Sequence, residues 1–281
     1  MAVTLTQAVR LASERGQPLP HIDWLAPLYA GGNEIYRGSL AVFAGVPGAR
    51  KTQFALAFVE SLGLPALYFS ADSDEGVIAP RVLAFRTGYK AKQIRKDLHD
   101  SPAAREFYGE ETSSVEYVFD PSPSIGEIQD EVSAWVERYD SFPEVIVIDN
   151  LLDVYSDFDS EHQGFKAVLK EFKTLARLTN AAVIVAHHNR EEDGKDAGKP
   201  LGRKSMHGRP TQTPALVLSL AIEGFDNFHV AVVKDRNGPS SPDADTYFTI
   251  LSDPEVNRFS ELKSLQRVTN DAWSPTAALE A

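Results

Sequence analysis

The chain has 281 residues and a mass of 30.9 kDa, enough for one large domain or two small ones. Its 28 basic and 40 acidic residues give a net charge of −12, which excludes a protein that coats nucleic acid through bulk positive charge but permits a local basic loop. The absence of cysteine excludes disulfides, thiolate nucleophiles and cysteine-ligated zinc. The sequence lacks an apolar run of the ~18 residues that a membrane span requires, and its start lacks a signal-peptide pattern, so we expect a soluble cytoplasmic protein.

The first predicted element is a short amphipathic helix over residues 6–15. Thr6 suits its N-cap and Gly16 its end. Two prolines within residues 17–20 then break the helix. We therefore expect residues 1–38 to form an N-terminal arm, either a surface helix on its own domain or an arm that docks on a neighbouring subunit.

From residue 39 onwards, apolar strands alternate with amphipathic helices. Residues 145–148 are wholly apolar, as expected for a parallel sheet that is covered on both faces. Ser124 and Glu127 form a capping-box pattern at the start of a helix. We predict an α/β domain with a mostly parallel sheet over residues 39–260, followed by a poorly ordered tail over residues 261–281. The expected strands are 40–44, 66–70, 145–148, 182–186, 216–221, 228–233 and 246–251, and the expected helices are 52–62, 124–138 and 165–178.

A phosphate-binding loop is predicted between the strand 40–44 and the helix 52–62, which is the context that such a loop requires. Backbone N–H groups and the helix N-terminus would hold the β- and γ-phosphates of a nucleotide. Lys51 would neutralise phosphate charge, and the Thr52 hydroxyl would bind Mg²⁺. The predicted nucleotide contacts are Gly45, Pro47, Gly48, Ala49, Arg50, Lys51 and Thr52. The alternative is a glycine-rich turn without a function.

Arg50 departs from the usual pattern of this loop, which has glycine at that position. If the position requires a positive φ, a residue other than glycine costs on the order of 1–2 kcal/mol. The arginine side chain must also turn away from the nucleotide or contact it. Nucleotide binding is therefore expected, whereas fast hydrolysis depends on how Arg50 is accommodated.

Asp149 follows the apolar strand 145–148 directly. An acidic residue at the carboxyl end of a buried parallel strand lies beside the phosphate loop in this topology, where it can hold a Mg²⁺-bound water. Many such residues are only strand ends. Because a phosphate loop precedes this one by about a hundred residues, we predict Asp149 as the second Mg²⁺ contact beside Thr52.

Two further strands end in polar residues. One is Tyr68-Phe69-Ser70-Ala71-Asp72, which is followed by a helix with Arg81-Val82-Leu83-Ala84. The other is Val183-Ile184-Val185-Ala186-His187-His188-Asn189-Arg190. With the phosphate loop, these segments resemble the ATPase domain of hexameric replicative helicases of the DnaB type, a RecA-fold family. The resemblance implies that Asp72 orients the water that attacks the γ-phosphate and that His187 senses the γ-phosphate.

A last segment strengthens the resemblance. Val232-Val233-Lys234-Asp235-Arg236-Asn237-Gly238-Pro239 is similar to the Lys-x-Arg-Asn-Gly-Pro segment of those helicases. The resemblance implies that Lys234 and Arg236 reach into the ATP site of a neighbouring subunit, with Arg236 as an arginine finger. A planar guanidinium would there stabilise the charge that develops on the transferring phosphoryl group. The alternative is an exposed basic turn.

The resemblance spans about residues 39–259 and implies a homo-oligomer, a hexameric ring with ATP sites between subunits. Because about 38 residues precede the core, we expect the separate N-terminal domain of these helicases to be absent. Asp72 is also shorter than the family's glutamate by one C–C bond of about 1.5 Å. These departures fit a compact, helicase-like ATPase of phage or plasmid type, active in a bacterial cell or a phage-infected bacterium.

Single-stranded DNA is the expected partner, bound by the loop after residue 190. The second half of this loop carries four basic residues with no acid between them: Lys199, Arg203, Lys204 and Arg209. The alternative is a solvated, flexible loop. A second candidate loop, residues 152–162, is acidic and would repel a phosphate backbone, because it contains Asp153, Asp157, Asp159 and Glu161.

His187 and His188 face opposite ways on a strand end, so we expect no metal site there.

The leading hypothesis is a Mg²⁺-dependent ATPase that moves along single-stranded DNA and unwinds duplex in replication. One alternative keeps the fold but forms filaments on single strands, as a RecA-like recombinase or recombination mediator. The other is a nucleotide-binding assembly protein with weak hydrolysis, which Arg50, Asp72 and the acidic loop would favour.

Overall fold

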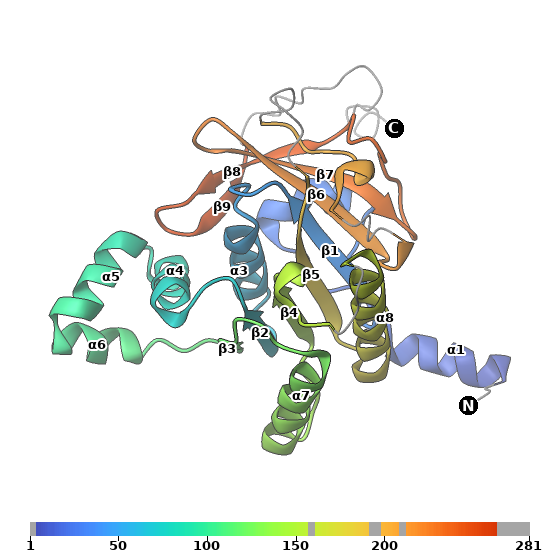
Figure 1. Ribbon diagram of the computed structural model, residues 1–281, viewed down its shortest axis with the longest axis horizontal. Helices are drawn as coiled ribbons and strands as arrows, with labels where there is room; N and C mark the ends of the chain where they lie inside the picture. The colour runs from blue at the N-terminus through green and yellow to red at the C-terminus, as the bar shows by residue number, and fades with distance from the viewer. Residues whose placement is uncertain (1–3, 157–160, 191–197, 208–211, 263–281) are drawn as a thin grey trace.

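The computed structural model describes residues 4–156, 161–190, 198–207 and 212–262 (Figure 1). The strands in this part of the chain are β1 Leu40–Gly45, β2 Ala66–Ser70, β3 Val115–Val118, β4 Val145–Asp149, β5 Ala182–His188, β6 Leu216–Glu223, β7 Asn227–Asp235, β8 Phe248–Asp253 and β9 Arg258–Glu261. They form one sheet in the order β3-β2-β4-β5-β1-β6-β7-β8-β9. The strands from β3 to β6 in this order are parallel, and β7, β8 and β9 add antiparallel pairs at one edge. The predicted α/β fold with a mostly parallel sheet is confirmed.

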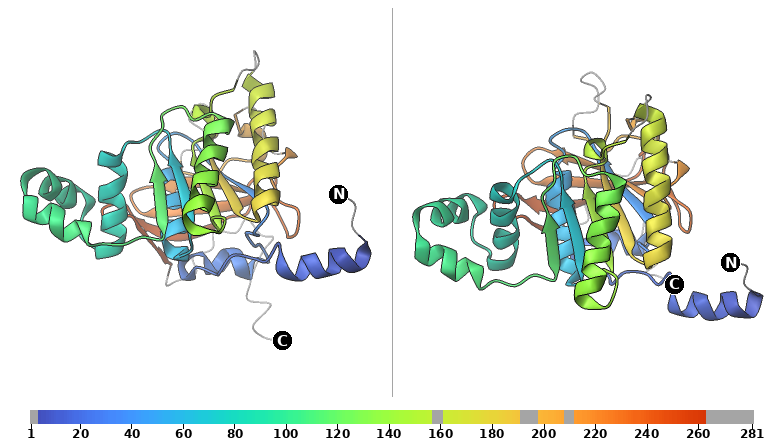
Figure 2. Two further views of the ribbon diagram at one scale, coloured as in Figure 1. Left: turned by 90° about the horizontal axis from the view of Figure 1, so that it is seen from below. Right: turned by 60° about the horizontal axis from the view of Figure 1, so that its bottom comes forward.

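The helices are α1 Leu5–Glu14, α2 Ala26–Ala30, α3 Lys51–Leu62, α4 Glu75–Thr87, α5 Ala91–Asp100, α6 Pro102–Gly109, α7 Ile125–Tyr139 and α8 Glu161–Thr179, with 3-10 turns η1 Asp23–Leu25, η2 Leu151–Asp153 and η3 Arg203–Ser205. They cover both faces of the sheet (Figure 2): α3 packs in the core of one face, and α7 and α8 pack in the core of the other. Because both faces are covered, every residue of β4 is buried.

Phe54 of α3 is the centre of the core on the α3 face. Its ring lies 5.4 Å from that of Trp24, 5.1 Å from Phe43, 5.4 Å from Phe228 and 5.7 Å from Phe259. These four rings come from η1, β1, β7 and β9. One helical side chain therefore joins the N-terminal segment, the central sheet and the antiparallel edge, and this packing fixes where α3 begins.

The N-terminal segment divides into two parts. Helix α1 extends away from the body of the molecule, with the side chain of Leu5 81% exposed and that of Val9 63% exposed (Figures 1 and 2). Residues 19–35, which the sequence assigned to the same arm, pack instead in the core with Phe54. The two prolines of residues 17–20 end α1, but the apolar side chains after them belong to the body of the domain.

Several elements have weak sequence signals and were not predicted. Helices α5 and α6 pack beside α4 on a small cluster of Ala84, Ile94 and Tyr108. β3 and β9 are short, and each has only one buried residue. The predicted capping box of α7 is confirmed, because the Ser124 hydroxyl accepts the Glu127 N–H and the Glu127 carboxylate accepts the Ser124 N–H. The predicted tail lies outside the described residues from residue 263 on. Among the described helices, none combines the length and apolarity needed to cross a bilayer.

Phe54→Ala tests the role of the aromatic cluster. We expect it to lower the free energy of unfolding by about 3–5 kcal/mol, because it removes a fully buried ring from four aromatic contacts. The measurement is a urea titration followed by circular dichroism. Phe142→Ala is the control, because that ring is 47% exposed, and a change within about 0.5 kcal/mol is expected there. Equal losses in the two variants would contradict this account of the core.

Candidate nucleotide site

The carboxyl ends of β1, β2, β4 and β5 meet at a cleft of about 500 Å³. Ligands bind at this edge of open α/β sheets. The cleft is lined by most of the residues that the sequence predicts for nucleotide and Mg²⁺: Pro47, Gly48, Arg50, Lys51, Thr52, Asp72 and Asp149. Gly45 and Ala49 are buried beneath the loop. A Cβ atom at Gly45 would lie 2.9 Å from the Leu220 carbonyl oxygen of β6, so only glycine fits that approach.

The turn between β1 and α3 has the backbone of a phosphate-binding loop. Gly48 has a φ of 78°, and the Ala49 N–H donates to the Val46 carbonyl at 3.1 Å. Helix α3 then begins at Lys51 and has no acidic residue in its first turn. The free N–H groups of this turn and the positive end of the helix dipole together favour a bound anion.

Arg50 adopts the left-handed conformation, with φ 57° and ψ 34°. The position does require a positive φ, as the glycine of the usual pattern suggested. The side chain turns toward β8, where its Nη1 donates to the Ser252 hydroxyl at 3.1 Å, and its guanidinium lies 5.7 Å from the centre of the Phe225 ring. Burial lowers the pKa of Arg50, and the nearby Asp226 partly offsets this effect.

Lys51 is folded back over the loop. Its Nζ donates to the carbonyls of Gly45 and Val46, both at 3.1 Å, and lies 3.3 Å from Nδ1 of His188. Burial lowers the pKa of Lys51 to about 8, and the charges of Asp149 and Asp72 oppose the shift. The two carbonyls are weak partners for an ammonium group, so a phosphate at the loop is a stronger one.

Asp149 is 3% exposed and accepts hydrogen bonds from the hydroxyls of Tyr68, at 2.8 Å, and Thr52. Burial raises the pKa of this carboxyl group, and the two hydroxyls lower it. Thr52 and Asp149 therefore lie together, as a Mg²⁺ site requires. Mg²⁺ takes only one or two protein ligands beside phosphate and water. This agrees with the described ranges, in which no group of three or more His, Asp or Glu side chains could hold a metal.

Asp72 lies on the loop that follows β2. The N–H groups of Ala71 and Asp72 donate to the Asp149 carbonyl at 2.8 and 3.4 Å, which holds the ends of β2 and β4 together. The Asp72 charge also acts on Lys51 and Asp149. The side chain is exposed to the cleft, where a water molecule can reach it.

His187 does not reach the cleft, and this corrects the prediction that it senses the γ-phosphate. Its side chain is fully buried on the α8 side, where its Nε2–H donates to the His207 carbonyl at 2.7 Å. Burial lowers the pKa of His187 to about 4, so the ring is neutral at pH 7. His188 instead lines the cleft and contacts Lys51. Neighbouring residues of a strand face opposite sides, and the α3 side is the side of the cleft.

Lys234 and Arg236 lie at the amino ends of the parallel strands, whereas the cleft lies at their carboxyl ends. Asp235 pairs with Leu216, which pairs with Ala41 at the start of β1, and β1 runs on for roughly 13 Å before it reaches the phosphate loop. Both side chains donate to the Gln212 carbonyl, Lys234 at 3.2 Å and Arg236 at 2.8 Å. Burial and the charges of Arg236, Arg203 and Lys173 lower the pKa of Lys234 to about 8.

Three of the four predicted DNA-binding residues lie within the described part of the chain. Lys199, Arg203 and Lys204 are exposed. Lys204 forms a long ion pair of 3.8 Å with Asp243, and Arg203 approaches Lys234 closely enough to act on its charge. Arg209 lies outside the described residues, as do Asp157 and Asp159 of the acidic loop.

The cleft is also lined by residues that were not predicted as part of the site, among them Arg81 of α4, His188 of β5 and Asn257 of the β8–β9 turn. The sequence of β5 is apolar at every position up to Ala186 and therefore does not separate His188 from His187. In the structure, Ile184 faces α3 whereas Val183 and Val185 face α8, which places His188 on the α3 side. Asn257 comes from a turn near the end of the chain, and no sequence pattern connects it to the phosphate loop.

Arg50→Gly and Arg50→Ala separate the backbone conformation of Arg50 from its side-chain contacts. Both variants lose the contacts with Ser252 and Phe225, but only glycine adopts φ 57° without strain. We expect the free energy of unfolding of the glycine variant to exceed that of the alanine variant by about 1–2 kcal/mol. Urea titrations of both variants measure this difference. Equal stabilities would show that the position is not left-handed in solution.

Comparison with known proteins supports a common origin with phage proteins. The Gene 65 protein of Mycobacterium phage L5 is 28% identical over 257 residues, which cover 88% of this chain and 94% of the relative. The Gene 65 protein of Mycobacterium phage D29 is 30% identical over 211 residues, which cover 72% of this chain and 90% of the relative.

The same fold occurs in solved structures. One solved ATPase domain superposes with a TM-score of 0.75 and 14% identity over 94% of this chain and 100% of that chain. A DnaB-like replicative helicase, described with its interactions with primase, superposes with a TM-score of 0.75 and 16% identity over 92% of this chain and 67% of that chain. A sequence profile of the AAA domain matches residues 6–194. The chain therefore belongs to the AAA domain family and has the fold of DnaB-type ATPase domains.

Proposed function

We propose that this protein is a Mg²⁺-dependent ATPase of DnaB type that moves along single-stranded DNA and unwinds duplex in replication. The observation that carries the proposal is the convergence of Lys51, Thr52, Asp72 and Asp149 on one cleft behind a phosphate-binding turn. The phage relatives support a role inside an infected bacterium.

ATP and Mg²⁺ fit the residues of the cleft. The left-handed turn and the first turn of α3 offer N–H groups to the β- and γ-phosphates. Lys51 neutralises phosphate charge once it exchanges the carbonyls of its own loop for phosphate oxygens. Thr52 and Asp149 hold Mg²⁺, which when bound neutralises charge on the phosphates.

Hydrolysis requires a group that orients water, and we assign this role to Asp72, because its exposed carboxylate lines the cleft. His188 takes the place of His187 as the residue that contacts the γ-phosphate, because it lies beside Lys51. Arg50 leaves the backbone of the loop intact and turns toward Ser252. This accommodation weakens one of the three reasons for expecting a nucleotide-binding protein with weak hydrolysis; Asp72 and the acidic loop are the other two.

The position of Lys234 and Arg236 supports an oligomer. These cations lie at the amino ends of the parallel strands, remote from the cleft of their own subunit, so they could contact a nucleotide only in the cleft of a neighbouring subunit. Their grouping with Arg203 and Lys173 favours an anionic partner, which the polyphosphate of a neighbouring subunit supplies. We propose a ring, of six subunits as in the family, with ATP between subunits and Arg236 as the finger.

Contact with DNA is the remaining part of the proposal. Lys199, Arg203 and Lys204 are exposed on the segment that leads toward residues 212–214, and the carbonyls of those residues accept from Lys234 and Arg236. Arg203 already acts on the charge of Lys234, so a DNA phosphate bound at Arg203 would change the electrostatic environment of Lys234. This connection supports a nucleic-acid-coupled ATPase.

The test is steady-state ATP hydrolysis with and without single-stranded DNA, with Lys51→Ala as the blank. We expect DNA to stimulate turnover by about tenfold or more, and Lys51→Ala to remain at background in both conditions because it lacks the phosphate-neutralising charge. ATP binding without turnover in either condition would refute the helicase proposal. Electron microscopy of the DNA-bound protein distinguishes the helicase from the recombinase, because closed rings support the former and open helical filaments the latter.

The pH dependence of ATP binding tests the role of Lys51. Without nucleotide, Lys51 has a pKa of about 8. Phosphate binds the protonated form of the side chain, so ATP binding raises this pKa and is accompanied by proton uptake. Affinity should therefore fall about tenfold between pH 7 and pH 9, as the protonated fraction of the free protein falls. Calorimetric titration measures both the affinity and the proton uptake. Lys51→Arg is the control, because arginine stays charged, and a similar loss of affinity in this variant would contradict the assignment to Lys51.

A further inference from the structure

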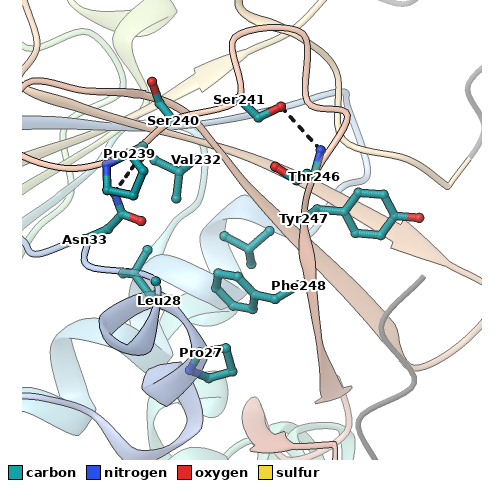
Figure 3. A pocket seen from close by; sticks show the side chains of 12 residues that line it. Pro27, Leu28, Asn33, Val232, Pro239, Ser240, Ser241, Thr246, Tyr247 and Phe248 are labelled. Carbon is teal, nitrogen blue, oxygen red and sulfur yellow. Dashed lines mark hydrogen bonds between the residues drawn. The ribbon is translucent and has the colours of Figure 1, made fainter. Parts of the chain in front are cut away.

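The segment that carries Arg236 is attached to a buried asparagine from the N-terminal part of the chain. Asn33 follows α2, is 4% exposed, and lies against Pro239 at the wall of a pocket between α2 and the ends of β7 and β8 (Figure 3). Neither Asn33 nor this pocket belongs to the nucleotide cleft. The contacts of Asn33 with Asp235 and Pro239 therefore indicate its role.

One amide group of Asn33 holds both ends of the segment. Its Nδ2 donates to the Asp235 carboxylate at 2.8 Å and to the Pro239 carbonyl at 2.8 Å. These two acceptors flank Arg236 on either side in the sequence. The other oxygen of the Asp235 carboxylate accepts the N–H of Asn237 at 2.7 Å, which closes the turn directly after Arg236.

Gly238 brings the same turn against the backbone of the α2 region. A Cβ atom at Gly238 would lie 2.5 Å from the Gly32 carbonyl oxygen, 2.8 Å from Nδ2 of Asn33 and 3.0 Å from the Asp235 carboxylate. The turn therefore approaches Asn33 as closely as a backbone can. Any side chain at this position would separate the turn from Asn33.

Hydrogen bonds and the close approach of Gly238, rather than interlocking side chains, hold the turn on this side. The space beside Asn33 and Pro239 is a pocket of about 270 Å³, whose walls include Leu28, Val232 and Phe248 (Figure 3). The turn is thus not wedged in place by side chains there. On its other side, the Arg236 guanidinium donates to the carbonyls of Gln212 and Thr213. The backbone and the side chain of Arg236 are fixed from two different directions.

We propose that Asn33 is a positioning residue for Arg236, which fixes the direction in which the guanidinium approaches the nucleotide of a neighbouring subunit. The inference rests on the proposed function, in which Arg236 acts between subunits. Since a small misplacement of a group that stabilises the transition state costs up to about a hundredfold in rate, the clamp acts on turnover rather than on nucleotide affinity.

Asn33→Asp tests the proposal, because it keeps the size of the side chain, removes both donors and places a carboxylate against Asp235. We expect DNA-stimulated ATP turnover to fall about 10- to 100-fold while ATP affinity stays close to wild type. Thermal stability should fall as well, because a carboxylate at this buried position faces Asp235 without a donor, so turnover is measured at a temperature at which the variant is folded. Ser240→Ala is the matched control, because Ser240 follows Pro239 on the wall of the same pocket and is not part of the clamp. Gly238→Ala breaks the clamp from the other side and should lower turnover in the same way, but it also shifts the turn, because its Cβ would lie 2.5 Å from the Gly32 carbonyl oxygen. Asn33→Ala removes both donors without adding charge or bulk, and covers the case in which Asn33→Asp does not fold.

Mixing variants distinguishes a misplaced finger from a damaged subunit. In a one-to-one mixture with Lys51→Ala, the Asn33 variant supplies intact clefts and the Lys51 variant supplies correctly placed Arg236 fingers. In randomly assembled rings, about a quarter of the sites combine an intact cleft with a correctly placed finger, so about a quarter of wild-type turnover should return. Arg236→Ala mixed with Lys51→Ala is the reference for this recovery. Recovery in both mixtures supports the proposal.

Two results overturn it: normal turnover in Asn33→Asp or Gly238→Ala, or recovery with Arg236→Ala but not with the clamp variants. Failure of the proposed function gives a different pattern. In that case wild type has no DNA-stimulated turnover, or Arg236→Ala is as active as wild type.

Discussion

The turn between β1 and α3 is the constraint on which the rest of the site depends. Gly45 lies so close to the Leu220 carbonyl of β6 that no side chain fits, and Gly48 and Arg50 both have a positive φ. This backbone places Lys51 over the loop and Thr52 beside Asp149. The chemistry of the cleft thus follows from a backbone conformation that β6 and α3 hold from opposite sides.

Arg50 shows how the chain offsets an unfavourable residue in that turn. A left-handed arginine costs on the order of 1–2 kcal/mol relative to glycine. The hydrogen bond to Ser252 and the contact with the Phe225 ring recover part of this cost, since a cation–π contact at an exposed site contributes about 0.5–1 kcal/mol. These contacts also connect the phosphate loop to β8 and to the β6–β7 turn. A glycine would form the loop equally well but would lack this connection.

The sequence is most informative where local composition decides the structure. The apolar run of β4 and the glycines before Lys51 were sufficient to predict the central strands, the phosphate loop and the position of Asp149. They were not sufficient for His187 and His188, because the choice between the two depends on which face of β5 α3 covers. Asn33 was beyond prediction, since its partners lie about two hundred residues away and no periodic pattern connects them. Sequence patterns thus omit contacts between distant segments, and they also omit short or largely exposed elements such as α5, α6, β3 and β9.

The cleft and the two cations lie at opposite ends of the parallel strands, and this separation bears on the proposed assembly. The cleft lies at the carboxyl end of β1, and Lys234 and Arg236 lie beside its amino end. If each subunit presents its cations to the cleft of the next, the interface joins two different surfaces, and repeated copies form either a closed ring or an open filament. The direction of Arg236 then influences whether the assembly closes, as well as its rate of hydrolysis. A buried clamp such as Asn33 would therefore affect the geometry of the assembly and its chemistry through the same two hydrogen bonds.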